Sequence, residues 1–390
     1  MEASPPSAHA PKQPVSRDIW RIGASGVASV VGFSALIPFA AIRLEALGYS
    51  SFAIGAFSAL PWLAVLLTAP FVETCVRRFG GDRMFVWGAL VAIPMPLVFA
   101  LSDSYALWCV ANLAMGLAAA FRWIVSEAWV ADIAPSDRRG RVVGTYETFL
   151  GASFASGPLL LLALDPRGDL PAYAGTALWF VAWLFAIGLS PAPRAQDGRK
   201  HDPGFGLVLA ASAAALVAAT IGGVFEVGLS GIGSYWGVTL GLSVNAAAMF
   251  AAALGVGSFL AQYPAGWLSD HASPAIIVRG GLSILIATSL AAPLLATDAI
   301  GALIVAVVWG GVGGMLYTLA MIQVGHGFSG PALMRATSAI VFGYTLGGTI
   351  GPAMIGAVLE IAPRHGLPLA LAALATTALG AHFYAARRRL

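Results

Sequence analysis

The stretch RVVGTYETFLGASFASGP at residues 141–158 returns in outline as RATSAIVFGYTLGGTIGP at residues 335–352. Each copy begins with arginine and ends with Gly-Pro, and the two copies are 194 positions apart. Pro70 and Pro264 are separated by the same offset. Landmarks that recur at one offset across half of a chain indicate an internal duplication, so we expect two similar halves that run in the same direction.

The composition places both halves in a membrane. Hydrophobic residues make up 58% of the 390 residues, charged residues only 10%, and the mean hydropathy is +0.83. A soluble domain usually carries about 25% charged residues to cover its surface. Since this chain cannot cover a surface of its size with charge, a soluble fold is excluded.

Twelve apolar stretches are each about long enough to cross a bilayer, which takes ~20 residues of helix. The polar segment 191–205 divides them into two groups of six, and residues 1–16 are rich in Pro, Ser and Ala. We predict a disordered cytoplasmic tail (1–16), a six-helix bundle (17–190), a cytoplasmic linker (191–205) and a second six-helix bundle (206–390). The predicted fold class is an all-α integral membrane protein with twelve transmembrane helices in two pseudo-symmetric bundles. The stretches are 19–42, 51–72, 84–101, 105–131, 142–164, 174–190, 206–236, 244–268, 275–296, 299–323, 333–360 and 366–386.

The distribution of basic residues predicts the orientation. Seventeen of the 21 Lys and Arg residues fall in segments that the helix count assigns to one side, three fall on the other, and Arg122 lies within a helix. Because cytoplasmic loops carry the excess of basic residues, both termini are expected in the cytoplasm of a multi-pass cell (inner) membrane protein. The net charge of +3 follows from this bias, so no nucleic-acid partner is expected.

Short motifs in three connections resemble those of the major facilitator superfamily. Gly266-Trp267-Leu268-Ser269-Asp270 resembles the family's G-x-L-[A/S]-D signature, and Arg139-Gly140-Arg141 resembles its basic loop between helices 4 and 5. The first-half counterpart, residues 77–83, keeps a basic loop with glycine but has Arg77 where the pattern has Asp. The resemblance implies the major facilitator fold and secondary transport by alternating access, with no cofactor. A partial match to the exporter pattern of helix 5 uses Gly144, Gly157 and Pro158.

The resemblance also implies a gate, because the matching Asp of the family closes the inner side by pairing with basic residues and a helix N-terminus. Asp270 is the candidate acid here. The candidate basic gate residues are Arg77, Arg78, Arg138, Arg139 and Arg141. Two Gly-Pro pairs are candidate hinges, with close helix packing as the alternative interpretation. They are Gly157-Pro158 and Gly351-Pro352.

Four charged residues within predicted helices are candidates for the substrate and proton pathway, because a charge in the bilayer is costly unless it has a partner or water. They are Arg122, Glu127, Glu147 and Glu226. Arg122 and Glu127 are five residues apart, so they should not share a helix face. We predict Glu127 and Glu226 as proton sites and Arg122 as the partner of a substrate anion. Glu147 is expected to serve either as a proton site or in the gate, and an interhelical hydrogen bond is the alternative for each acid.

Four aromatic residues are candidates for the lining of a central cavity, with packing or anchoring at the membrane interface as the alternative. They are Trp62, Trp123, Trp236 and Tyr317. The predicted function is secondary transport of a small organic or amphipathic solute, coupled to protons or another ion, with export favoured. Proton-driven uptake of an organic anion is the alternative within transport. An integral-membrane enzyme is disfavoured, because the loops are short and poor in the clustered acids, histidines or metal ligands that its site would need. A transporter-derived sensor is disfavoured, because no appended soluble domain is expected. Scattered histidines and two cysteines predict no metal site, and a monomer in the lipid bilayer is expected.

Overall fold

The computed structural model describes residues 17–387 except residues 50, 166, 190–204, 230–232, 234–235, 238, 243 and 363. For some residues in this range, Pro158 and Pro352 among them, only the backbone is described. The predicted tail at 1–16 and residues 191–204 of the predicted linker lie outside the described residues.

The described chain is helical throughout, with short connections. The longer elements are α1 (Arg17–Ala46), α2 (Ser51–Thr68), α3 (Val72–Phe79), α4 (Gly81–Ala92), α5 (Met95–Leu101), α6 (Tyr105–Ile133), α7 (Arg139–Ala163), α8 (Leu170–Ala186), α9 (Phe205–Gly223), α11 (Val244–Ser269), α12 (Pro274–Leu295), α13 (Ala299–Gly327), α14 (Gly330–Ile361) and α15 (Gly366–Arg387). Two 3-10 turns and one π-helical segment join them, namely η1 (Ala69–Phe71), η2 (Ser136–Arg138) and η3 (Val224–Gly228).

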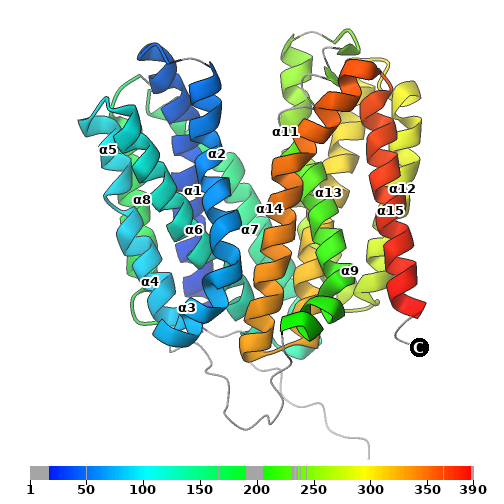
Figure 1. Ribbon diagram of the computed structural model, residues 1–390, viewed down its shortest axis with the longest axis horizontal. Coiled ribbons are helices and arrows are strands. Elements are labelled where there is room, and N and C mark those ends of the chain that lie inside the picture. The colour runs from blue at the N-terminus through cyan, green and yellow to red at the C-terminus, as the bar shows by residue number, and fades with distance from the viewer. Residues whose placement is uncertain are drawn as a thin grey trace, which may run out of the picture.

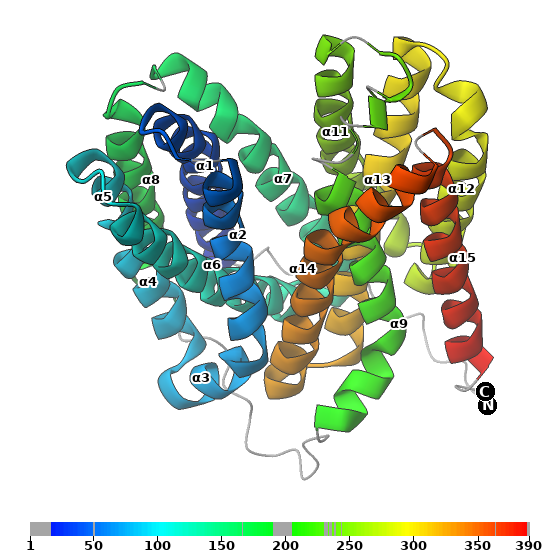
Figure 2. The same cartoon turned by 45° about the horizontal axis from the view of Figure 1, so that its top comes forward.

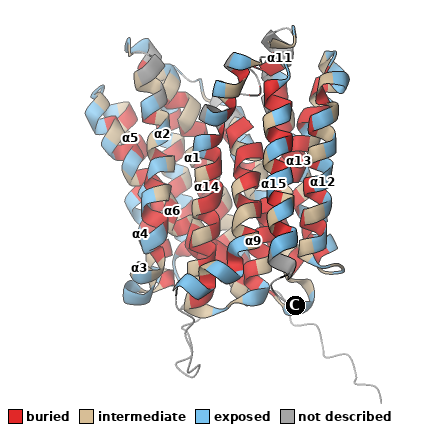
Figure 3. Cartoon of the chain, turned by 45° about the vertical axis from the view of Figure 1, so that its right-hand side comes forward, coloured by how far each residue is buried: buried red, intermediate tan, exposed pale blue. Residues whose placement is uncertain are grey.

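The outer faces of these helices suit a lipid environment. Each of the twelve apolar stretches contains at least one described helix, and nine spans in the described residues are long and apolar enough to cross a membrane. Figure 3 shows exposed positions along the outer helix faces and buried positions toward the interior. Leu294 and Ile361, for example, are 80% and 87% exposed. An apolar surface of this extent is stable in lipid rather than in water, so the chain is an all-α integral membrane protein.

The helices form two groups that meet at one end. Figures 1 and 2 show α1–α8 in one group and α9–α15 in the other, with the groups diverging toward the top of Figure 1. We call the lower end, where α1 begins and α15 ends, the base, and the opposite end the mouth. Because α1 begins and α15 ends at the base, the described chain crosses the bundle an even number of times.

Two helices carry most of the contact between the groups. α7 packs against α11, while α14 packs against α2, α3 and α6. Near the base the backbones of α7 and α11 touch: a Cβ atom on Gly140 would lie 2.2 Å from the carbonyl oxygen of Gly266. Only glycine permits this approach, so these two positions fix how closely the halves meet at the base.

Two of the predicted membrane helices are interrupted. The stretch 51–72 is divided by η1, which contains Pro70, and the stretch 84–101 is divided at Pro94. Proline removes a backbone donor and disrupts the preceding turn. The prediction of a basic loop at residues 77–83 is wrong in detail, because α3 continues to Phe79 and α4 begins at Gly81. Gly80 makes the turn with φ of +92°, a conformation that favours glycine.

Candidate functional site

Glu127 lies where the two halves touch. Its side chain is on α6 and only 1% of the residue is exposed. Trp123, one turn earlier on α6, donates from Nε1 to Glu127 Oε1 at 3.1 Å and to the hydroxyl of Tyr317 on α13 at 3.0 Å. The Tyr317 hydroxyl donates to Glu127 Oε1 at 3.3 Å. Trp123 and Tyr317 therefore lie side by side, and together they hold one carboxyl group.

Glu226 is the acid that the second half contributes near this contact, through the Tyr344 ring that lies beside Tyr317. It lies in η3, and a π-helical turn at the end of a membrane helix often accompanies a functional residue. Ser258 of α11 donates to Glu226 Oε1, and Tyr344 of α14 donates to Oε2 at 2.8 Å. Gln262, one turn after Ser258 on α11, donates from Nε2 to Ser258 Oγ at 3.4 Å. Both carboxyl oxygens of Glu226 thus accept a hydrogen bond.

Aromatic rings connect the two carboxyl groups. The ring centroids of Tyr317 and Tyr344 are 4.6 Å apart, and Trp123 meets the Tyr344 ring edge to face at 5.9 Å. Since Tyr317 bonds Glu127 and Tyr344 bonds Glu226, contacts run from one acid to the other through two tyrosines. This row of contacts crosses the boundary between the halves.

Glu147 adds a third carboxyl group from α7. It is 5% exposed, and its Oε1 has no hydrogen-bond partner. The carboxyl groups that act on it electrostatically are those of Glu127 and Glu226. The structure thus places Glu147 with the other acids rather than with the gate residues at the base.

These residues lie at different depths in the bundle. A helix rises 1.5 Å per residue, so Glu127 is about 9 Å along the axis from the base end of α6. Tyr344 is about 21 Å from the base end of α14 by the same measure. Glu226 is partly exposed, whereas Glu127 and Glu147 are buried. The row of contacts therefore runs from a partly exposed acid to two buried acids nearer the base.

Arg122 lies away from this group, inside the first half. Its Nη1 donates to the Phe85 carbonyl oxygen at 2.9 Å, and its Nη2 donates to Ser25 Oγ at 2.8 Å. The guanidinium also lies over the Phe85 ring, 4.1 Å from its centroid. Arg122 and Glu127 indeed face different neighbours, as their spacing predicted. The Arg122 guanidinium joins α6 to α1 and α4 within the first half, and it does not face the second half.

Asp270 closes the base between the halves. Its Oδ1 accepts from the Gly140 backbone N–H at 2.7 Å, and its Oδ2 accepts from the Arg141 backbone N–H at 3.1 Å and from Arg141 Nε at 2.9 Å. The carboxylate therefore caps the N-terminus of α7 and forms an ion pair with the same turn. Backbone donors and the helix dipole both favour an anion there. Its side chain is 3% exposed.

The other predicted basic gate residues occupy different places at the base. Arg139 donates from Nη1 to the Gly325 carbonyl oxygen of α13 at 2.6 Å, which adds a second contact between the halves. Arg138 lies in η2, immediately before α7. Arg78 is exposed in the last turn of α3, with its guanidinium over the neighbouring Phe79 ring.

A second acid at the base faces Arg335. Glu73 Oε1 on α3 is 3.8 Å from Arg335 Nε on α14 and 3.5 Å from Arg77 Nη1. Arg335 and Arg141 are the two arginines that begin the repeated stretch. Each of them therefore meets an acid of the opposite half, Asp270 in one case and Glu73 in the other. Glu73 was not among the predicted site residues.

The Gly-Pro pairs lie within continuous helices. A Cβ atom on Gly157 of α7 would lie 2.0 Å from Ser34 Oγ of α1. A Cβ atom on Gly351 of α14 would lie 3.3 Å from Val224 of η3. The side chains of Pro158 and Pro352 are outside the described residues. Close packing of α7 against α1 accounts for a glycine at position 157. A hinge at either Gly-Pro pair stays a prediction.

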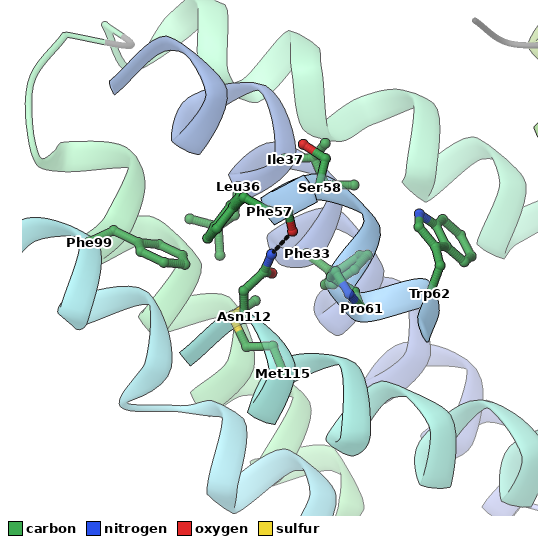
Figure 4. A pocket seen from close by; sticks show the side chains of 10 residues that line it. All are labelled: Phe33, Leu36, Ile37, Phe57, Ser58, Pro61, Trp62, Phe99, Asn112 and Met115. Atoms are coloured by element: carbon green, nitrogen blue, oxygen red, sulfur yellow. Dashed lines mark hydrogen bonds between the residues drawn. The ribbon is translucent and has the colours of Figure 1, made fainter. Parts of the chain in front are cut away.

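A small cavity in the first half has a structural explanation (Figure 4). Pro61 lacks a backbone N–H, which leaves the Phe57 carbonyl oxygen without its helical partner. Asn112 Nδ2 donates to that oxygen at 2.8 Å. The other lining side chains are mostly apolar, with Trp62 at one side. The side-chain amide of Asn112 therefore replaces the backbone hydrogen bond that Pro61 removes from α2.

Comparison with known proteins identifies the family. Residues 22–352 match the family model described as Major Facilitator Superfamily. The chain belongs to the Major Facilitator Superfamily. Membership points to a transporter of small molecules in a membrane rather than to an enzyme.

Two curated relatives and one solved structure are similar to this chain. The chain is 29% identical over 249 residues to the "Uncharacterized MFS-type transporter YfkF" of Bacillus subtilis (strain 168), covering 62% of this chain and 64% of that protein. It is 27% identical over 128 residues to "Multidrug resistance protein 2" of the same organism, covering 33% of this chain and 32% of that protein. The matches thus span less than two thirds of either relative. The human organic anion transporter MFSD10 (TETRAN) superposes with a TM-score of 0.79 at 13% identity, covering 95% of this chain and all of that one, which shows a shared fold.

Several contact residues in this superfamily member were not anticipated from the sequence. Tyr344, Ser258 and Gln262 hold or support Glu226, and Tyr146 donates to Ser126 at 2.8 Å beside the acids. Ser258 and Gln262 are four residues apart within an apolar helix, and that spacing on one helix face was an available signal. Tyr344 had no such signal, because a single tyrosine in a membrane helix is usually a packing residue.

Proposed function

We propose that the protein is a secondary active transporter that moves a small amphipathic solute by alternating access, with proton movement through Glu226, Glu147 and Glu127 as the energy source. The observation that carries this proposal is the row of contacts from Glu226 through Tyr344 and Tyr317 to Glu127. Buried carboxyl groups that hydrogen-bond across two moving halves can load and release protons as those halves separate. The superfamily fold provides the two helical halves that this mechanism requires to move relative to each other.

The base is proposed to be the cytoplasmic side of the inner membrane, with both termini inside the cell. Seventeen of the 21 basic residues fall in the segments assigned to that side. With Asp270, Arg139 and Arg141 in contact across the base, the structure then corresponds to a state closed toward the cytoplasm. Glu226, the partly exposed acid, would exchange protons with the outside in this state. A monomer suffices, because the row of contacts lies within one chain.

Export is proposed as the direction of solute movement. The partial match of Gly144, Gly157 and Pro158 to the exporter pattern favours it, and one relative carries a multidrug resistance name. The alternative, proton-driven uptake of an organic anion, rested on Arg122. Because its guanidinium is engaged by Phe85 and Ser25 within the first half, that alternative loses its support.

Reconstitution tests this proposal. Amphipathic compounds that stabilise the purified protein in a thermal-shift screen would be loaded into liposomes that contain it, and a pH gradient would be imposed. The proposal predicts solute movement against its own gradient that collapses when the pH gradient is dissipated. Movement that only equilibrates the solute at every imposed gradient contradicts proton coupling, and no movement of any stabilising compound contradicts transport.

A further inference from the structure

A second cavity lies at the base of the first half, between α4 and the end of α8. These two helices pack together on the side of the first group that is remote from the second group (Figure 1). The cavity has a volume of about 150 Å³ and is lined on α4 by Asp82, Arg83, Val86 and Trp87. We propose that it binds the phosphodiester headgroup of an anionic phospholipid such as phosphatidylglycerol. This inference concerns the lipid around the protein and goes beyond the proposed transport function.

The α4 side of the cavity has the residues of a membrane interface. Arg83 lies in the first turn of α4, at the base, and Trp87 lies one turn further into the bundle on the same helix face. Arg83 is exposed and Trp87 is 46% exposed, so a lipid can reach the cavity from outside the bundle. Tryptophan is enriched where hydrocarbon meets headgroups, because its ring is apolar and its N–H is polar. A bound lipid would therefore place its phosphate at Arg83 and its glycerol region at Trp87.

The charge around the cavity favours one negative group. Arg21 of α1 donates from Nη1 to the Gly188 carbonyl oxygen at 2.8 Å and from Nε to the Phe185 carbonyl oxygen at 3.2 Å. It thereby holds the end of α8 beside the cavity. Arg83 makes no hydrogen bond or ion pair with any residue that the structure describes, and Asp82 is the acid of the lining. Two arginines and one acid leave one positive charge, which a phosphodiester neutralises and a zwitterionic headgroup does not.

Apolar side chains continue from the cavity along both helices. Leu90 and Val91 follow Trp87 at helical spacing on α4 and are 46% and 50% exposed. Leu184 and Val181 precede the end of α8 by the same kind of spacing and are 49% and 37% exposed. The acyl chains of a lipid whose phosphate occupies the cavity can lie along these residues. Inorganic phosphate makes no such contact, so the surface suits a phospholipid rather than a free anion.

The equivalent place in the second half is filled by the protein itself. By the offset of 194 residues, α4 corresponds to α12, α8 corresponds to α15, and Leu189 of the cavity lining corresponds to Phe383. The guanidinium of Arg279 on α12 lies over the Phe383 ring, 4.8 Å from its centroid. The arginine of the second half thus has an aromatic partner within the chain. Since the duplication does not require an open cavity, the cavity beside Arg83 is a property of the first half alone.

Lipid binding to the full chain tests this inference. The protein would be stripped of lipid in detergent, and native mass spectrometry would measure the affinities of phosphatidylglycerol and phosphatidylethanolamine with identical acyl chains. We expect phosphatidylglycerol to bind more tightly. Arg83→Gln should lower its affinity about fivefold, which is the effect of one basic residue near an anionic lipid surface. Arg279→Gln removes the same charge at the base of the second half and should leave the affinity unchanged.

A second variant separates the shape of the cavity from its charge. Val86→Phe keeps every charge and places a ring in the space that the headgroup would occupy, so it should also weaken phosphatidylglycerol binding. Arg83 is exposed, so Arg83→Gln is expected to fold even if Val86→Phe does not. Circular dichroism and the melting temperature in detergent would check the folding of each variant.

Several results would overturn the inference. Equal affinities for the two lipids would contradict an anionic headgroup, and an affinity that Arg83→Gln leaves unchanged would contradict the site. An equal loss in Arg279→Gln would show a general effect of charge, and unchanged binding by folded Val86→Phe would place the lipid outside the cavity. Displacement of phosphatidylglycerol by an equal concentration of inorganic phosphate would assign the cavity to a soluble anion instead of a lipid.

Discussion

Trp123 Nε1 donates a hydrogen bond to the hydroxyl of Tyr317 at 3.0 Å, and the two residues are 194 positions apart in sequence. That separation equals the offset of the internal repeat, so the two residues occupy equivalent positions on α6 and α13. Equivalent positions can touch only beside the pseudo-symmetry axis. The axis that relates the two halves therefore passes between these rings, and Glu127 sits beside it.

The Trp123–Tyr317 contact should be measurable as a coupling energy. Trp123→Phe and Tyr317→Phe each remove the shared hydrogen bond and leave a ring, so each should lower stability by about 1 kcal/mol. Since both variants remove the same bond, the double variant should be less destabilised than the sum of the singles. Reversible unfolding in detergent measures this. Effects that add to within about 0.3 kcal/mol would show that the two residues do not interact.

The Asp270 contact should hold the base closed. Asp270→Asn keeps an acceptor for one backbone N–H but loses the charge that Arg141 and the α7 N-terminus share. Charge-assisted bonds contribute about 1.5–3 kcal/mol, so the equilibrium should shift toward the base-open state by tenfold or more. Spin labels at the exposed positions Arg83 and Ile276, on opposite halves at the base, would report this as a longer distance. An unchanged distance distribution in a folded variant would leave Asp270 as a loop charge.

Glu73 should form a weaker contact that also holds the base closed. Its partner is Arg335, which is the counterpart of Arg141 in the repeat. Its 3.8 Å separation from Arg335 exceeds the 2.9 Å of the Asp270–Arg141 pair. Glu73→Gln should therefore open the base in the same spin-label measurement, but less than Asp270→Asn does. Asp82→Asn, an acid of the neighbouring turn without a described contact across the halves, serves as the control. An equal effect of Glu73→Gln and Asp82→Asn would contradict a specific role for Glu73.

The sequence predicted the fold better than the site for a physical reason. Helix positions follow from apolar length, and the pairing of halves follows from the repeat, so α6, α7, α13 and α14 lay close to where they were expected. Glu127 and Glu226 were recognisable because charge in lipid is costly. The partners of a side chain depend on helix rotation and on which faces meet, and neither is encoded locally. For that reason Arg122 was expected to meet the substrate but is held by Phe85 and Ser25, and Tyr344 was overlooked.

Topology stays a prediction that labelling can check. Single cysteines placed within residues 191–205 and after Arg387, in a variant without Cys75 and Cys109, should react only with reagents that reach the cytoplasm. The expected pattern is protection from a membrane-impermeant maleimide on intact cells and full labelling after permeabilisation. A cysteine at the exposed residue Leu101, at the mouth, provides the reverse control. Labelling of either cytoplasmic position on intact cells would contradict the even number of crossings.

Proton coupling through the buried acids is the central claim, and Glu226→Gln tests it most directly. Glutamine keeps the size of the side chain and an acceptor for Tyr344, but it cannot carry a proton. In liposomes with a solute that the wild-type protein moves uphill, Glu226→Gln should abolish accumulation driven by a pH gradient while solute exchange without a gradient continues. Glu127→Gln should give the same result. If both variants still drive uphill transport with unchanged pH dependence, the acids do not couple transport to protons.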